Sequence, residues 1–594
     1  INYKIKNTIL SRLSCMNGSN AFLSRVQTQF GQIQGLWSRS LRGRLVAYYL
    51  GVPYAQPPVG DLRFRSPQPW NHTWNDTFEA IQDGPMCLQL DSRGKSVGRE
   101  DCLYLNIFVP MSQGDSKLPV MVFIHGGGYM IGSSDSRLLS PEYLMDQNII
   151  LVTINYRLNV MGFFSTANGV SPGNYGVKDA LMALQWIHEN IEAFQGDPNS
   201  VTLWGQSVGA GITHILALNN KTEGLFGRYI LQSGNAVAPW IAQSKRSFDT
   251  IDRNEYDEEE DEKMMRCMRT VGGSLIVKAM KHLDVWRGNP CCIFAPTIED
   301  ESDDAVLTMH PIVIIKHRLF RDIPFIIGVV KDEGLEKSID FLTNKVAEEE
   351  FLNIFEDLLP YVLEIDQIVA NTSALASAIE DFYFEGNVAW NFLQNITEVL
   401  IWPAYETLKW QSDNMNSSTY FYIFEYEGTF SSTFQSGSSK HYGVSHGDDF
   451  NYLLPVLNKL FKDQMLHNTE TDVTMINIMT EMWASFATKG VPEAWEVTAW
   501  PDYKQTHKYL QFGINRDPEI IVESRFPTEK IAFWENLMTN TTLGAIEFHL
   551  AIEPPSMEEQ KLNNSISTKL DKSLVWLFAS AFTLYLSYVS LFLE

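Results

Sequence analysis

A serine between two glycines is the first feature of this sequence that could do chemistry. The segment Gly205-Gln206-Ser207-Val208-Gly209 follows the apolar run VTLW and precedes the small-residue run AGITHILAL. This pattern is typical of a sharp strand-to-helix turn, in which glycines leave room for closely packed backbone and the serine Oγ is exposed above a sheet. Ser207 is therefore a candidate nucleophile for attack on a carbonyl carbon.

Three adjacent glycines offer hydrogen-bond donors for the oxygen that becomes negative after such an attack. His125-Gly126-Gly127-Gly128 follows the apolar run PVMVFI. The N–H groups of Gly127, Gly128 and Val208 would face this oxygen, and each would contribute on the order of 3 kcal/mol. A plain flexible turn is the alternative interpretation, and the presence of Ser207 disfavours it.

A serine nucleophile needs a base and an acid, which on this type of fold follow the serine in the order acid, then histidine. The run PFIIGVV ends at Asp332 and Glu333, and either carboxylate could orient the imidazole and stabilise its cation. His446 is favoured as the base because its loop, YGVSHGDD, follows an aromatic strand; His441 in the same loop is the alternative. The order of the residues leaves these histidines as candidates: His441, His446, His467, His507 and His549.

Apolar β-rich runs alternate with helical patterns between about residues 25 and 550. This rhythm predicts βαβ units and a large, mostly parallel or mixed central sheet flanked by helices, in one large α/β domain. A helix is predicted over residues 177–194, where apolar residues recur near helical spacing before Gly196-Asp197-Pro198. The predicted strands span residues 119–125, 149–156, 201–205, 228–232, 324–330 and 419–427.

Composition excludes several classes of protein. The 594 residues include 46 Lys+Arg and 71 Asp+Glu, and this net charge of −25 without a segregated basic run argues against nucleic-acid binding. A hydrophobic content of 45% excludes wholesale disorder. Six cysteines without C-x-x-C spacing predict neither a disulfide-dense scaffold nor a zinc site, so no metal and no cofactor is expected. The acidic run DEEEDE at residues 257–262 is predicted to be a solvated surface loop.

The two ends of the chain suggest targeting. Residues 574–593 are uncharged and mostly apolar, and a polar linker at residues 551–573 precedes the tail at 574–594. With Asn563 as the attachment residue, this pattern predicts a signal for a GPI anchor; a retained membrane anchor and a buried helix are the alternatives. Residues 1–24 have neither an initiating Met nor a signal-peptide core, so we expect the start to be incomplete.

Glycosylation acceptors favour the secretory route. An N-x-[ST] pattern occurs nine times, against roughly three or four expected by chance. The excess predicts an extracellular glycoprotein, attached to the cell surface through the lipid anchor; an Asn-rich composition is the alternative. The acceptors are Asn17, Asn71, Asn75, Asn220, Asn371, Asn395, Asn416, Asn540 and Asn563.

Nine segments resemble the type-B carboxylesterase/cholinesterase family of α/β-hydrolases, over about residues 26–548. They are GVPYAQPPVGDLRF (51–64), EDCLYLNIF (100–108), VMVFIHGGGY (120–129), INYRL (154–158), GNYGVKDALMALQWI (173–187), FQGDPNSVTLWGQSVGAG (194–211), LQSG (231–234), GVVKDEG (328–334) and GVSHGDDFNYLLP (443–455). The resemblance implies the α/β-hydrolase fold. It assigns Ser207 as nucleophile, Glu333 rather than Asp332 as acid, and His446 rather than His441 as base.

The same resemblance implies supporting roles for further residues. Ser233 would support Glu333, and Gln206 and Trp240 would line the substrate pocket. It implies a Cys87–Cys102 disulfide, worth roughly 3 kcal/mol, and pairing of Cys267 with Cys291 or Cys292. Two scaffold ion pairs are also implied, Arg63–Glu100 and Arg157–Asp179.

Departures from the cholinesterase pattern narrow the expected substrate. The segment CLQLDSRGKSVGREDC contains no aromatic residue, and Gln206 stands where cholinesterases have a Glu before the serine, so a choline site is not supported. The Gln resembles the GQSAG motif of insect juvenile hormone esterases. The expected function is hydrolysis of an uncharged small-molecule carboxylic ester through an acyl-enzyme. A catalytically silent adhesion ectodomain and a stoichiometric ester scavenger are the alternatives.

Overall fold

The computed structural model describes residues 24–112, 116–241, 258–366, 369, 371–383, 388–434, 439–524, 526 and 528–541. The predictions for Asn17, the linker, the apolar tail and Asn563 therefore concern residues outside this described part of the chain. Within the described residues, no helix is both long and apolar enough to cross a membrane.

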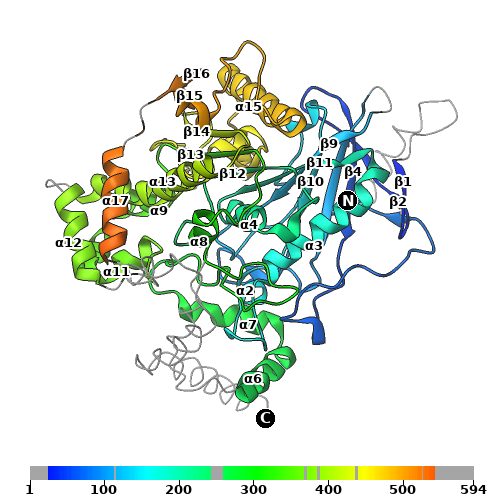
Figure 1. The fold of residues 1–594 in the computed structure, drawn as a ribbon, viewed down its shortest axis with the longest axis horizontal. Helices are drawn as coiled ribbons and strands as arrows, with labels where there is room; N and C mark the ends of the chain where they lie inside the picture. Colours follow the sequence, from blue (N-terminus) through cyan, green and yellow to red (C-terminus); the bar gives the residue numbers. More distant parts are fainter. Residues whose placement is uncertain are drawn as a thin grey trace.

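A large mixed sheet forms the centre of the molecule (Figure 1). It has eleven strands in the order β16-β15-β14-β13-β12-β11-β9-β10-β8-β4-β3. Neighbouring strands from β15 to β10 in this order pair in parallel. The pairs β10–β8, β8–β4 and β4–β3 at one side, and β15–β16 at the other, are antiparallel. The strands span β3 Leu36–Arg39, β4 Leu45–Pro53, β8 Tyr104–Pro110, β9 Leu118–Ile124, β10 Ile150–Ile154, β11 Gly196–Gln206, β12 Arg228–Gln232, β13 Phe325–Val330, β14 Thr419–Tyr426, β15 Tyr509–Asn515 and β16 Asp517–Glu523.

Two small sheets accompany the large one near the N-terminal part of the described chain. One contains β1, β2 and β5, and the other contains β6 and β7. Their strands span β1 Arg25–Thr28, β2 Gly31–Gln34, β5 Phe78–Glu79, β6 Gln89–Leu90 and β7 Ser96–Val97.

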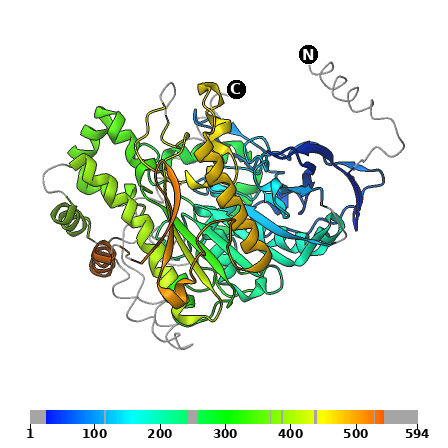
Figure 2. The same ribbon diagram turned by 90° about the horizontal axis from the view of Figure 1, so that it is seen from above.

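The central strands are buried on both faces, because successive side chains point to opposite sides of the sheet. On β9, Val120 and Val122 belong to the core that also contains residues of α3 (Tyr175–Asn190) and α4 (Val208–Ala217). The alternate residue Met121 packs instead in the core that contains residues of α15 (Glu470–Lys489), the long helix that crosses the strands in Figure 2. The helices thus sandwich the sheet.

A group of helices with its own apolar cluster lies at one edge of the molecule, on the left of Figure 1. It contains α9 Leu335–Thr343, α10 Lys345–Asn353, α11 Phe355–Val362, α12 Thr372–Tyr383, α13 Val388–Asn414 and α17 Thr528–Thr541. The other helices are α2 Asn159–Phe163, α6 Glu258–Thr270, α7 Gly273–Ala279, α8 Pro311–Lys316, α14 Val456–Leu460 and α16 Tyr503–Thr506.

The predicted elements agree with the structure to within a few residues, except at the acidic run. Each of the six predicted strands lies on one of β9 to β14, and the predicted helix is α3 followed by a 3-10 turn at Ile191–Phe194. The loop prediction for residues 257–262 was wrong, because residues 258–262 begin α6. Acidic side chains stabilise a helix N-terminus, and Glu259 and Glu262 also pair with Lys263 and Arg266 one turn later.

The cysteine predictions are met in part. The Cys87–Cys102 disulfide is present, as are the ion pairs Arg63–Glu100 and Arg157–Asp179. The expected pairing of Cys267 was wrong. Cys267 lies exposed on α6, whereas the Sγ of Cys291 faces the Sγ of Cys292 at 3.5 Å, so no disulfide joins Cys267 to either.

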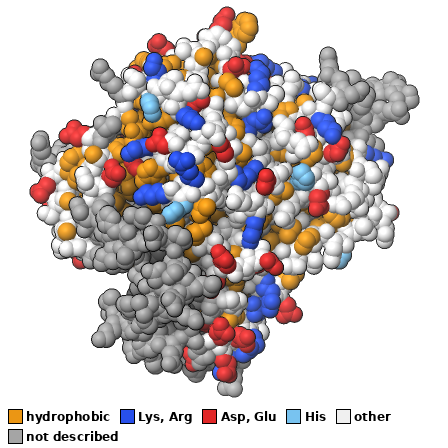
Figure 3. All heavy atoms as spheres, viewed as in Figure 1, with side chains coloured by type: hydrophobic (Ala, Val, Ile, Leu, Met, Phe, Trp, Pro, Cys, Tyr) orange, Lys and Arg blue, Asp and Glu red, His pale blue; other side chains and the backbone are white. Residues whose placement is uncertain are grey.

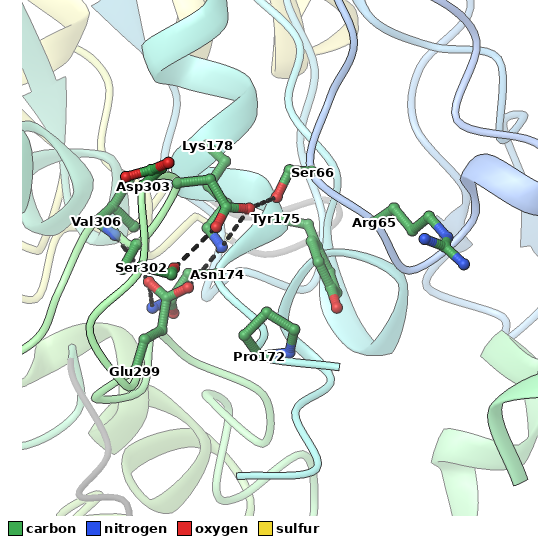
Figure 4. A network of polar contacts seen from close by, with 12 residues as sticks. Arg65, Ser66, Pro172, Asn174, Tyr175, Lys178, Glu299, Ser302, Asp303 and Val306 are labelled. Carbon is green, nitrogen blue, oxygen red and sulfur yellow. Dashed lines mark hydrogen bonds and ion pairs between the residues drawn. The ribbon is translucent and has the colours of Figure 1, made fainter. Parts of the chain in front are cut away.

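A buried ion pair attaches α3 to the segment before α8 (Figure 4). The Nζ of Lys178 lies 2.5 Å from the Oε1 of Glu299, and both side chains are at most 3% exposed. The other oxygen, Oε2, accepts hydrogen bonds from the side-chain amide of Asn174 (2.8 Å) and the backbone N–H of Val306 (2.9 Å). This carboxylate therefore holds two distant segments together.

We expect the substitution Glu299→Gln to lower the free energy of unfolding by about 3–5 kcal/mol, because it leaves the buried ammonium of Lys178 without its closest counter-charge. Urea unfolding followed by tryptophan fluorescence measures the change. The matched control is Glu192→Gln, whose pair with Lys117 is exposed, with side chains 64% and 46% accessible, and should change stability by at most about 1 kcal/mol. Equal effects of the two substitutions would contradict the structural role of Glu299.

Candidate active site

Ser207 lies at the turn between β11 and α4, in a backbone conformation that side chains rarely adopt. Its φ is 57° and its ψ is −129°, which costs about 1–3 kcal/mol. The turn is tight enough that a Cβ on Gly205 would lie 2.2 Å from the carbonyl oxygen of Gly209. The backbone N–H of Ser207 donates to the carbonyl oxygen of Gln232 on β12. These contacts hold the serine at the end of a central parallel strand.

Glu333 and His446 meet in the interior beside this turn. The Oε2 of Glu333 lies 2.6 Å from the Nδ1 of His446, and the glutamate side chain is 0% exposed. Its other oxygen, Oε1, accepts the backbone N–H of Val330 at 2.9 Å. The neighbouring Asp332 instead accepts the N–H of Val444 at 3.0 Å. The structure thus brings Glu333, and not Asp332, to the histidine.

Backbone pairing places the two loops that carry this contact. Asp332 and Ser445 form a parallel β-bridge, which joins the turn after β13 to the loop after β14. The carboxylate of Asp448 accepts the N–H groups of Ser432 at 2.7 Å and Ser445 at 3.0 Å, so both sides of the second loop are held together. His441 lies apart, with its ring edge-on to Phe434.

The environment of His446 favours its protonated form. Burial lowers the pKa of the imidazole, but the carboxylate of Glu333 raises it through its charge and its hydrogen bond, and Glu336 and Asp449 add to this effect. The net result raises the pKa of His446 from 6.5 to about 9. An imidazole that accepts a proton readily at this position is suited to act as a general base.

Gln206 contacts the nitrogen of His446 that faces away from the glutamate. The Nε2 of Gln206 lies 3.2 Å from the Nε2 of His446. When Nδ1–H donates to Glu333, the neutral ring has a lone pair on Nε2, and this lone pair accepts the amide N–H. Within the described residues, His446 Nε2 therefore hydrogen-bonds to Gln206 and not to the Oγ of Ser207. Gln206 occupies the position from which the base would take a proton.

The glycine loop packs directly against the serine turn. A Cβ on Gly126 would lie 2.5 Å from the Oε1 of Gln206 and 2.9 Å from the Cβ of Ser207. Gly127 and Gly128 have positive φ angles of 105° and 61°, which glycine adopts without strain. Val208 begins α4 and is buried. That the three N–H groups point at a reacting oxygen stays a prediction.

Two residues that sequence reasoning did not identify support the glycine loop and the surroundings of His446. The O–H of Tyr156 donates to the carbonyl oxygen of His125 at 2.8 Å, and their rings stack, which anchors the loop where it leaves β9. Asp449 is fully buried, and its Oδ2 accepts hydrogen bonds from Tyr422 (2.6 Å) and Gln232 (2.9 Å). Both residues lie in the family-like segments, but their roles depend on contacts between distant strands.

The supporting role expected for Ser233 is not seen. Its side chain is buried, and its Oγ has no hydrogen-bond partner in the described structure, so it does not bond to Glu333. Trp240 is buried in the main core, and no hydrogen bond of its indole N–H links it to the site in the described part of the chain.

Most of the predicted glycosylation acceptors are exposed: Asn71, Asn75, Asn220, Asn371 and Asn416. Asn395 and Asn540 lie on α13 and α17.

Comparison with known proteins places this arrangement in a family. The family model described as "Carboxylesterase family" matches residues 23–534. The chain belongs to the carboxylesterase family. As a carboxylesterase it is a carboxylic ester hydrolase, of class EC 3.1.1.-.

Several insect esterases resemble this carboxylesterase over most of its length. A carboxylic ester hydrolase of Bombus ignitus is 34% identical, over 87% of this chain and 94% of the relative. Esterase FE4 of Myzus persicae is 35% identical, over 80% of this chain and 86% of the relative. The crystal structure of juvenile hormone esterase from Manduca sexta, with OTFP covalently attached, is 28% identical, with a TM-score of 0.72, and covers 86% of this chain and 99% of that chain.

We expect Glu333→Gln to lower kcat by about 10³–10⁴-fold, because an amide cannot stabilise the imidazolium or hold the required tautomer. The wild-type kcat/KM should fall as the pH drops through the raised pKa of His446, so its acid limb lies above 6.5; in Glu333→Gln the limb moves to lower pH. Rates with nitrophenyl butyrate between pH 5 and 10 measure both effects. Asp332→Asn is the matched control, and a loss of activity there equal to that of Glu333→Gln would refute the assignment.

A second pH profile tests the contact of Gln206. In Gln206→Glu, a carboxylate faces Nε2 and stabilises the imidazolium, so the acid limb should move up by about 1 unit, equivalent to 1.36 kcal/mol. Gln206→Met, of similar length and without charge, should not move the limb upward. An unchanged acid limb in Gln206→Glu would show that this side chain does not act on the base.

Proposed function

We propose that this carboxylesterase is a serine esterase that cleaves uncharged carboxylic esters through an acyl-enzyme. Ser207 Oγ attacks the ester carbonyl carbon while His446 Nε2 takes its proton. The tetrahedral intermediate then expels the alcohol, which receives this proton from His446, and the acyl group stays on Ser207. Water, deprotonated by the same nitrogen, attacks the acyl carbon. The second tetrahedral intermediate then releases the carboxylic acid, and Ser207 Oγ receives the proton from His446 as it leaves.

The observation that carries this proposal is the buried contact of Glu333 with His446 beside a strained Ser207. The carboxylate accepts the Nδ1 hydrogen and so leaves the Nε2 lone pair directed to the other side of the ring. The negative charge also stabilises the imidazolium that forms during attack. Before attack, the amide of Gln206 must give up its hydrogen bond to Nε2 so that Ser207 can take its place.

The oxyanion of each tetrahedral intermediate would be bound by backbone donors. Gly127 and Gly128 lie in the loop that packs against Ser207, and Val208 is the first residue of α4, whose N-terminus favours negative charge. Because these groups belong to a packed loop and a helix end, they need little rearrangement during the reaction. They would contribute on the order of 3 kcal/mol each.

The lining of the site favours a neutral substrate. Gln206 supplies an uncharged side chain next to the nucleophile, and the Cys87–Cys102 segment contains no aromatic side chain that could hold a cationic alcohol group. Relatives named juvenile hormone esterase occur in Tribolium castaneum (32% identical) and Manduca sexta, and the latter holds OTFP covalently. We propose that the substrates of this enzyme are uncharged carboxylic esters.

We also propose that the enzyme is an extracellular glycoprotein held by a lipid anchor at Asn563. The exposed positions of Asn71, Asn75, Asn220, Asn371 and Asn416 support glycosylation. The uncharged residues 574–593 support the anchor. The face in Figure 3 carries acidic and basic side chains interspersed with apolar ones.

We expect Ser207→Ala to reduce kcat for nitrophenyl acetate and butyrate by at least about 10⁴-fold, because no other group in the site can form the acyl-enzyme. Steady-state rates with the secreted enzyme measure the loss, and circular dichroism checks that the variant folds. Ser302→Ala, on the exposed segment beside Lys221, is the control and should keep wild-type rates. Retention of more than a few per cent of the activity in Ser207→Ala would exclude the serine mechanism.

A further inference from the structure

Two adjacent thiols and a carboxylate form a cluster outside the triad. The Sγ atoms of Cys291 and Cys292 lie 3.5 Å apart, in the segment between α7 and α8. A carboxylate oxygen of Glu364, which follows α11, completes the group, and the three ligand atoms all lie within 4.8 Å of one another. Tetrahedral zinc with Zn–S bonds of about 2.3 Å requires two sulfurs about 3.8 Å apart. The observed spacing is close to this value.

The carboxylate of Glu364 is held in place by the cysteine segment itself. Its Oε1 accepts the backbone N–H of Cys291 at 2.6 Å, and its Oε2 accepts that of Cys292 at 3.2 Å. Lys337 on α9 forms an ion pair with Oε1. Because a carboxylate oxygen can accept two hydrogen bonds, Oε2 keeps a lone pair for a ligand bond. The donor atoms are thus ordered before any ion binds.

The cluster borders the oxyanion loop. A Cβ on Gly128 would lie 3.5 Å from both the Sγ and the carbonyl oxygen of Cys291. Cys291 is partly exposed, which gives an ion access, whereas Cys292 is only 5% exposed and lies behind it. An ion bound by these sulfurs would therefore sit against the loop that carries the proposed oxyanion donors.

We propose that Cys291, Cys292 and Glu364 bind a thiophilic divalent cation of the zinc class, and that the bound ion slows ester hydrolysis by displacing the oxyanion loop at Gly128. Two thiolates and one carboxylate are donors that such ions prefer, and a fourth position stays open. The inhibitory effect rests on the proposed function, whereas the binding itself does not.

Sequence spacing could not indicate such a site. The prediction of no metal rested on the lack of C-x-x-C pairs, but these cysteines are adjacent and Glu364 lies 72 residues from Cys292. The third ligand is brought in by the helices α9 to α11 rather than by a local motif.

The test titrates Cd²⁺ into the full-length enzyme with a phosphine reductant present, and records ultraviolet Cd–thiolate absorption and nitrophenyl butyrate hydrolysis together. We expect absorption that saturates at one equivalent and a rate that falls with the same midpoint. Cys291→Ser and Cys292→Ser should need at least about 10-fold more Cd²⁺ for either signal. The matched control is Cys267→Ser, which removes an exposed thiol elsewhere and should behave as wild type.

Two further measurements keep the outcome clear. Cd²⁺ should protect Cys291 and Cys292 of the unmutated enzyme from iodoacetamide, as read by peptide mass, which requires no variant to fold. Ser207→Ala should keep the absorption, so that failure of the serine mechanism does not hide the site. Three outcomes would each overturn the proposal. They are inhibition by Cd²⁺ that persists unchanged in Cys291→Ser, thiolate absorption that is lost only in Cys267→Ser, and an absence of thiolate absorption in the wild type.

Discussion

The hydrogen bond between buried Glu333 and His446 is the contact on which the site depends. A carboxylate that is fully removed from water needs partners, and here they are the Nδ1 hydrogen of the histidine and the backbone N–H of Val330. The same bond sets the ring orientation and raises the pKa of the imidazole. In the proposed mechanism, this contact gives Ser207 its base. Strands β11, β13 and β14 belong to the parallel part of the sheet, with β12 between β11 and β13, and the turns that follow them bring these three residues to one edge of the sheet.

Much of the fold and of the candidate site could be predicted from the sequence, because the glycines and apolar runs that indicate them are local patterns. The glycines around Ser207 permit the tight turn, and the apolar runs before it and before Glu333 mark strands whose ends meet at one edge. The residues alone did not show whether Asp332 or Glu333 contacts the histidine, and only the family resemblance favoured Glu333. The structure gives the physical reason: Asp332 forms the backbone bridge to Ser445, and this bridge turns the next side chain toward His446.

Most of the features that sequence reasoning missed depend on contacts between distant segments. The acidic run was assigned to a loop because like charges repel, but a helix N-terminus and cations one turn later compensate for them. Cys267 was paired by family resemblance, yet α6 carries it to the surface while Cys291 faces the glycine loop. The contact of Gln206 with His446 Nε2 required the loop after β14 to be placed first. The last two cases depend on tertiary packing that no spacing in the chain encodes, whereas the acidic run is explained by its own i, i+4 pairs.

Trapping the acyl-enzyme would show whether Ser207 is the nucleophile. A nitrophenyl ester with a slowly hydrolysed acyl group is mixed with the enzyme, the reaction is quenched in acid within the first turnover, and the digested protein is mapped by mass spectrometry. We expect one equivalent of acyl group on the peptide that contains Ser207, formed at the rate of nitrophenol release and lost at the rate of turnover. An acyl group on another residue, or full turnover with Ser207 unmodified throughout, would contradict this expectation.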